Sequence, residues 1–138
     1  MEEVCCEVET GDIDLLQRVA LLKAQAKEYV RQSQARMLLT PVGEHLLTKF
    51  GGVVLSKKLQ ELLNRLRLQV ARTPGYAGGN ILNLALHLQL DITGFDFSRL
   101  TVWEAYLRGA NLPAVNFSDA ELARVALGYI WRHSFTCH

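Results

Sequence analysis

The feature that most constrains this fold is a five-residue period that runs from Leu90 to Tyr129. Divided into fives, the stretch reads LDITG, FDFSR, LTVWE, AYLRG, ANLPA, VNFSD, AELAR and VALGY. All sixteen residues at the first and third positions of these units are apolar, against six of the twenty-four at the other positions. The third positions supply the predicted repeat core: Ile92, Phe97, Val102, Leu107, Leu112, Phe117 and Leu122.

A period of five fits neither an α-helix nor an ordinary strand, whose side-chain periods are about 3.6 and 2 residues. It fits a square coil in which every side holds one short extended unit and one corner. Two side chains of each unit then point inward and three point outward. The bare end of such a coil exposes unpaired strand edges, so a cap is required.

Composition and charge narrow the class of protein. The chain has 138 residues and is 49% hydrophobic, which suits one domain with a substantial core. A net charge of +1 gives no overall attraction to nucleic acid or to acidic membranes. No apolar run is long enough to span a bilayer, and the start, MEEVCCEVE, lacks the plan of a secretory signal. Three cysteines without a disulfide or metal-binding spacing indicate a reducing cytoplasm.

Residues 1–72 are predicted to form a helical segment. A first helix over 2–9 ends at Thr10-Gly11, and Asp12 is the expected N-cap of a long amphipathic helix that reaches about Leu39.

Two further helices are expected in this segment. Thr40-Pro41 predicts a helix restart, and Gly51-Gly52 predicts its end. Ser56 is the expected cap of the next helix, which runs to Ala71.

The remaining boundaries follow from turn residues. Residues 73–89 are predicted to be a joint and a capping helix, with Asn80 as the N-cap of a helix over 81–89. This helix leads into the repeat coil at 90–129 and would close its first turn. Ser118 and Glu121 also match a capping box, so residues 123–132 stay open between repeat and helix. Residues 130–138 are expected to be a poorly ordered tail.

A basic stripe on the helix at 56–71 is the one candidate interaction surface. Lys58, Arg65 and Arg72 are seven residues apart and therefore share one helix face. A nucleic-acid surface is one interpretation. A solvated face is favoured, because Glu61 interrupts the patch and no aromatic side chain is interleaved for base stacking.

No constellation in the sequence predicts catalysis, a cofactor or a metal. Gly51-Gly52 and Gly78-Gly79 lack the following Lys and Ser/Thr of a phosphate loop. The four histidines are dispersed, and a metal site at the tail is not favoured because a mobile terminus binds weakly. The tail residues concerned are His133, Cys137 and His138. The aspartates at outward repeat positions suit solvation or corner hydrogen bonds better than acid–base work: Asp91, Asp96 and Asp119. The chain is therefore predicted not to be an enzyme.

The repeat resembles the pentapeptide-repeat family, with Ala-Asn-Leu at 110–112 and Val-Asn-Phe at 115–117 as its best matches. The resemblance implies a right-handed quadrilateral β-helix with four units per coil, so the forty repeat residues would make about two coils. The expected fold class is α+β, with an N-terminal helical bundle that caps a short β-helix.

Longer strings resemble one region of cyanobacterial-type STAND signalling NTPases. In those proteins an NB-ARC-like ATPase and a winged helix precede the region, and a WD40 propeller follows it. The matching strings are PGYAGGNILNL at 74–84, DITGFDFSRLTVWEAYLRGANL at 91–112, VNFSDAEL at 115–122, ETGDIDLL at 9–16, ALLKAQAKEYVRQSQARMLL at 20–39 and LLTKFG at 46–51.

The resemblance implies a non-enzymatic connector that links a nucleotide switch to a WD40 sensor, with those protein domains as partners. Neither the ATPase nor the propeller is present, and ALGYIWRHSFTCH at the end departs from the family, so the chain is expected to be a fragment. The alternative is a nucleic-acid-binding or topoisomerase-modulating pentapeptide-repeat protein. The oligomeric state stays open.

Overall fold

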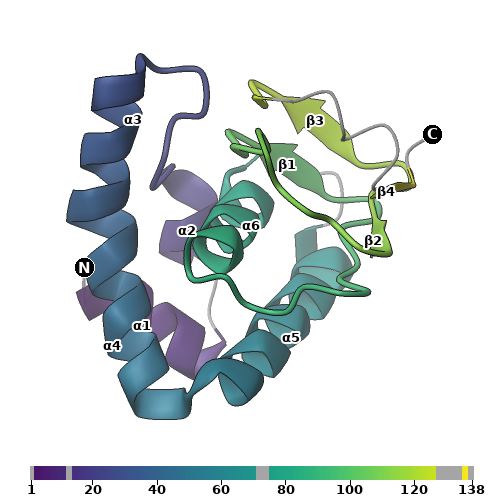
Figure 1. The fold of residues 1–138 in the computed structure, drawn as a ribbon. Coiled ribbons are helices and arrows are strands. Elements are labelled where there is room, and N and C mark those ends of the chain that lie inside the picture. The colour runs from purple at the N-terminus through teal and green to yellow at the C-terminus, as the bar shows by residue number, and fades with distance from the viewer. Residues whose placement is uncertain (1, 12–13, 71–74, 127–134, 137–138) are drawn as a thin grey trace.

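The computed structural model describes residues 2–11, 14–70, 75–126 and 135–136. The helices α3, η1 and α4 form one continuous rod. This rod, the central helix α6 and a layer of short parallel strands lie side by side, with α5 below them (Figure 1). The helical elements are α1 (Glu2–Thr10), α2 (Asp14–Arg18), α3 (Glu28–Gln34), η1 (Ala35–Leu39), α4 (Thr40–Phe50), α5 (Gly52–Val70) and α6 (Ala77–His87). The strands are β1 (Thr101–Trp103), β2 (Val115–Asn116), β3 (Glu121–Ala123) and β4 (Phe135–Thr136).

The long helix predicted to reach Leu39 is interrupted. It is divided into α2 and α3, and residues 19–27 between them are not α-helical. The N-cap predicted at Asp12 lies outside the described residues. The first turn of α2 is instead capped from α1, because the Glu7 carboxylate accepts the backbone N–H groups of Leu15 (2.5 Å) and Leu16 (2.8 Å). Periodicity could not reveal a cap that comes from another helix.

Helix α4 begins at the predicted Thr40-Pro41, but it does not restart there from a new cap. The helical backbone continues from α3 through the π-helical turn η1 into α4, with both flanking residues of η1 in the right-handed helical region. Pro41 lacks the N–H of a regular turn, and its ring would clash with the Met37 carbonyl in an unbroken α-helix. The wider π turn directly before Pro41 accommodates that defect within one rod.

Two predicted caps lie inside helices. Helix α5 begins at Gly52, so Ser56 is in its interior, where the Ser56 hydroxyl donates to the Asp91 carbonyl at 2.8 Å. Helix α6 begins at Ala77, and Asn80 is buried within it. The predicted end of α4 is confirmed, since Gly51 follows Phe50 with a φ of +77°.

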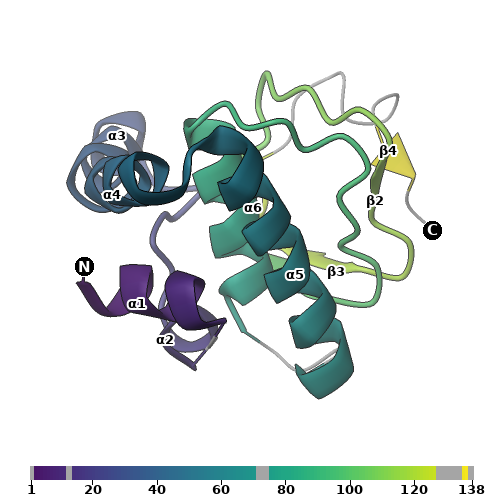
Figure 2. The same ribbon diagram turned by 90° about the horizontal axis from the view of Figure 1, so that it is seen from below.

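Helix α6 lies against β1 at the centre of the molecule (Figure 1). Seen from below, α6 lies between the α3 and α4 helices and β2 (Figure 2). A Cβ at Gly79 would come within 1.8 Å of the Trp103 carbonyl oxygen, and one at Gly78 within 2.7 Å of the Thr101 oxygen. This glycine pair therefore lets a helix backbone approach a strand backbone directly. The same core cluster contains residues from the helices and from the repeat.

In the repeat, every strand pairing is parallel and joins residues twenty positions apart. Thr101 pairs with Glu121 and Val115 pairs with Phe135. Isolated bridges join Asp96 to Asn116 and Tyr106 to Ala126. The region that the sequence left open therefore continues the repeat as far as 126, and the described part of the tail, β4, is a strand. Residues 127–134 lie outside the description.

Six members of the predicted repeat core are at most 3% exposed, and Leu122 is half-buried. The backbone has the same five-residue period. Positive φ angles occur at every fifth residue: Gln89, Gly94, Arg99, Glu104, Gly109, Ala114, Asp119 and Arg124. Each unit thus turns its corner at one left-handed residue. Most of these residues carry a Cβ, for which the left-handed conformation costs about 1–2 kcal/mol. The packing of the repeat offsets this conformational cost.

We expect Gly94→Ala and Gly109→Ala each to lower the free energy of unfolding by about 1 kcal/mol, because both positions require the left-handed conformation. No heavy atom lies within 4 Å of a Cβ placed at either position, so conformation alone is tested. Chemical denaturation measures the change. The matched control is Gly52→Ala in α5, where alanine is the better helix former and stability should not fall. Equal losses at all three positions would contradict the corner assignment.

Candidate functional site

The residues considered for catalysis or metal binding do not converge. Within the described residues, no three His, Cys, Asp or Glu side chains are placed to hold a metal ion. His87 is exposed, and its Nε2 lies 2.8 Å from the Thr40 hydroxyl. The tail residues His133, Cys137 and His138 lie outside the described part. No helix among the described residues is long and apolar enough to cross a membrane.

The predicted basic stripe is partly engaged in contacts within the chain. Arg65 donates from Nη1 to the Gly11 carbonyl at 2.7 Å. The Lys58 ammonium lies 4.7 Å from the centroid of the Phe50 ring. Arg72 lies outside the described residues. Two of the three predicted cations therefore contact other groups of the chain, and Arg65 is exposed.

Arg67, on the same helix, joins α5 to the repeat. Its side chain is only 11% exposed. It donates from Nε to the Ser98 carbonyl at 3.0 Å and from Nη2 to the Asp96 carbonyl. Its guanidinium also lies 3.4 Å from the Asp96 carboxylate. The Asp96 carboxylate also accepts a hydrogen bond from the Ser98 N–H at 2.9 Å. In the same way, the Asp91 carboxylate accepts one from the Thr93 N–H at 3.0 Å. The corner hydrogen bonds predicted for these two aspartates are therefore confirmed.

A buried polar network joins α6 to the repeat residues that directly follow β1. Asn83 is 3% exposed, and its Nδ2 donates to the Glu104 carbonyl at 2.8 Å. Its Oδ1 accepts the Tyr106 N–H, also at 2.8 Å. The side-chain amide thus makes the two hydrogen bonds that a neighbouring parallel strand would otherwise make.

Asn80, one helical turn earlier, holds the segment between α2 and α3. Its Oδ1 accepts the Leu21 N–H at 2.8 Å, and its Nδ2 donates to the carbonyls of Leu16 (2.8 Å) and Val19 (2.6 Å). The Glu104 carboxylate accepts the Ala24 N–H at 2.9 Å. We call residues 19–27 the strap, because side chains from α6 and the repeat satisfy its backbone.

Glu104 is a charged residue in the core of this network. It is 4% exposed, and its carboxylate lies 3.7 Å from the guanidinium of Arg124, twenty residues further along the repeat. Burying a carboxylate costs free energy unless it has such hydrogen-bond and charge partners. The network therefore ties together the strap, α6 and two successive levels of the repeat.

Sequence reasoning missed this network, although a signal was present. The string GGNILNLAL places Asn80 and Asn83 three residues apart on one face of an otherwise apolar helix. Buried amides in such a setting must find hydrogen-bond partners.

A second polar cluster joins α1 to α4 at the surface. The Glu9 carboxylate accepts a hydrogen bond from Lys49 Nζ at 3.0 Å and lies 3.2 Å from His45 Nε2. The hydrogen bond from Lys49 is the main cause that lowers the pKa of Glu9 below its usual value, and His45 adds to the effect.

The comparisons with known proteins give one relative. The chain is 50% identical over 105 residues to an uncharacterized WD repeat-containing protein of Nostoc sp. strain PCC 7120. The match covers 75% of this chain but only 8% of the relative. No family model matches the chain, and no solved structure matches it. The chain therefore spans only a small part of the length of this relative.

We expect Asn83→Ala to lower the free energy of unfolding by about 2–4 kcal/mol, because it leaves a buried carbonyl and a buried N–H unpaired. Equilibrium denaturation measures the loss. The matched control is Asn111→Ala, since Asn111 is exposed. Hydrogen exchange at the Tyr106 amide should accelerate only in the first variant. A loss below about 1 kcal/mol would contradict the edge-pairing role.

Glu9 makes a pH-dependent contribution to stability. Because its pKa is lowered in the folded chain, its contribution is complete above the usual glutamate pKa of about 4.3 and is lost as the pH falls through the folded value. Glu9→Gln should lower the melting temperature at neutral pH, and the difference from wild type should disappear in acid. Glu44→Gln, at an exposed position on α4, is the control. A difference that persists unchanged in acid would refute this.

Proposed function

We propose that the chain is a non-enzymatic connector of a STAND-type signalling ATPase and links a nucleotide switch to a WD40 sensor. The observation that carries this proposal is the buried polar network of Asn80, Asn83 and Glu104. A connector transmits domain motion only if its two ends move together. The network fastens the helical part to the repeat through hydrogen bonds at 2.6–2.9 Å.

The similarity to part of a WD repeat-containing protein supports the context of this proposal, because an interaction module in a long multidomain chain needs domain partners. The NB-ARC and winged-helix neighbours are inferred from the family resemblance of the sequence. The cytoplasm, as the location of such a signalling protein, is part of the same proposal.

The repeat is proposed to be a right-handed quadrilateral β-helix that acts as the rigid end of the connector. The twenty-residue pairing distance supports it, because four units of five residues make one coil. Hydrogen bonds between successive levels occur on four consecutive units, from Gly94, Phe97, Glu104 and Leu107. A left-handed corner at every fifth residue fits the same geometry.

The nucleic-acid alternative receives no support from the described side chains. Arg65 and Lys58 are engaged by Gly11 and Phe50, and the net charge of the chain is only +1. Proteins that bind through phosphate contacts need several free cations on one face.

The test of the connector role is binding to the WD-repeat part of the Nostoc relative, expressed as a separate polypeptide. We expect saturable binding in isothermal titration, with a Kd on the order of micromolar because interdomain interfaces resemble transient ones. An unrelated WD-repeat domain of similar charge is the control. The chain alone should neither bind nor hydrolyse ATP. Absence of binding to the relative's WD repeats, or ATP hydrolysis by the chain, would overturn the proposal.

A further inference from the structure

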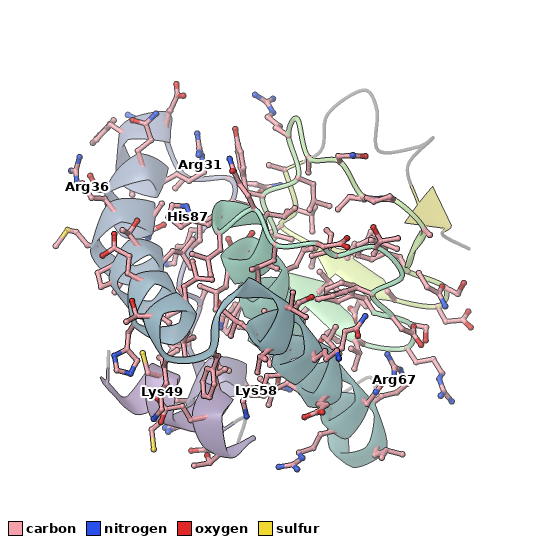
Figure 3. All side chains as sticks on the ribbon, turned by 60° about the horizontal axis from the view of Figure 1, so that its bottom comes forward. Arg31, Arg36, Lys49, Lys58, Arg67 and His87 are labelled. Carbon is pink, nitrogen blue, oxygen red and sulfur yellow. The ribbon has the colours of Figure 1, made fainter. Side chains whose placement is uncertain are left out.

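A cleft separates the upper part of the rod from the repeat, and the connector role does not use it. Its volume is about 700 Å³, and its walls come from α3, η1, the end of α6 and repeat residues 89–93 and 106–113. A neighbouring hollow of about 500 Å³ shares Arg31, Tyr106 and Arg108 with it. Figure 3 shows Arg31 and His87 extending from α3 and α6 into the space between the rod and the central helix. The volume falls within the range of about 300–1,000 Å³ found for small-molecule sites.

Arg31 is the unusual residue of this cleft. Its side chain is 15% exposed, and its guanidinium lies 3.8 Å from the centroid of the Tyr106 ring. Its one ion pair among the described residues is with Glu28 at 3.6 Å, and that carboxylate is 75% exposed. No hydrogen bond leaves the guanidinium within the described part of the chain. Its donors keep access to water and are available to a ligand, and a planar guanidinium fits both oxygens of a carboxylate.

Arg108 supplies a second cation at the same cleft. Its side chain is exposed and makes no ion pair or hydrogen bond with the described residues. His87 is on the α6 wall, where its Nε2 is 2.8 Å from the Thr40 hydroxyl. An anionic ligand group would therefore meet one oriented guanidinium and one that is free to move towards it.

Two features restrict the ligand to a single anionic group. Asp91 also lines the cleft, and hydrogen bonds from the Thr93 side chain and backbone lower its pKa, so this carboxylate stays charged and repels a polyanion. Glu28 acts in the same sense at the neighbouring hollow. Part of the remaining cleft wall is apolar: Leu22, Ala35, Leu39, Leu86, Leu90, Ile92, Ala110 and Pro113. Asn83, Gln89, Thr93 and Asn111 add neutral polar groups to the same wall.

We propose that this cleft binds a small amphiphilic carboxylate, with its carboxylate on Arg31 and Arg108 and its apolar body against the leucine-rich wall. Ligand sites of this kind combine mostly apolar walls with a few placed polar groups. The stack on Tyr106 holds the Arg31 fork in position before the ligand arrives, which reduces the entropy lost on binding.

The probe is octanoate, titrated into the ¹⁵N-labelled full chain and followed by NMR. We expect saturable shifts at the Arg31 Nε–H and at the Tyr106 amide. Octanol has the apolar body without the charge, and acetate has the charge without the body. Both should bind at least about tenfold more weakly, because each lacks one of the two interactions. Equal binding of octanol or acetate, or no saturable binding of octanoate, would overturn the proposal.

Variants separate the site from general surface effects. Arg31→Gln should weaken octanoate binding by roughly tenfold or more, since it removes charge-assisted hydrogen bonds. Arg108→Gln changes an exposed side chain, so it should fold normally and still weaken binding several-fold. The matched control is Arg36→Gln, because Arg36 is exposed on η1 and does not line the cleft. Unchanged binding in both Arg31→Gln and Arg108→Gln, or an equal loss in Arg36→Gln, would refute the site. None of these results depends on binding to WD repeats.

Discussion

The structure depends on how the free edge formed by β1 and the residues directly after it is satisfied. A parallel stack has a first level whose outward N–H and C=O groups have no strand beside them, and burying them unpaired would be costly. Helix α6 lies along that edge, close enough because Gly78 and Gly79 present no side chain to it. The Asn83 amide then pairs with the Glu104 carbonyl and the Tyr106 N–H. One side chain thereby replaces a missing strand.

Once α6 is fixed on the repeat, the other helices are arranged around it. Asn80 on the same face holds the strap, so the interruption between α2 and α3 is stabilised by tertiary hydrogen bonds. From α5, Arg67 reaches the carbonyls of Asp96 and Ser98. The rod stands further away and contacts the repeat through the stack of Arg31 on Tyr106. That separation leaves the cleft beside a body that is otherwise closely joined.

Predictions from the sequence were accurate where one local rule was sufficient. Gly51 ends α4 because only a left-handed residue suits that position, and five-residue spacing identified the buried repeat positions up to Phe117. They failed where a polar residue has a distant partner. Asn80 and Ser56 have good capping chemistry, but their side chains bond to Leu21 and Asp91 instead. Pro41 suggested a helix start, and the π turn before it removed that need. No local pattern in the sequence indicated the role of Arg67, because its acceptors are about thirty residues away in the chain.

The sequence by itself determined the period of the repeat, since two inward side chains in every five must be apolar whatever surrounds them. It also determined that helices precede the repeat, because the spacing of apolar residues is a local property. Only the tertiary structure decided where those helices break and which polar groups join them to the repeat. Hydrogen bonds such as the one from Ala24 to Glu104 connect residues eighty positions apart, and no local pattern records such a pairing. The cleft has the same origin, because its arginines converge only after the rod and the repeat have folded against α6.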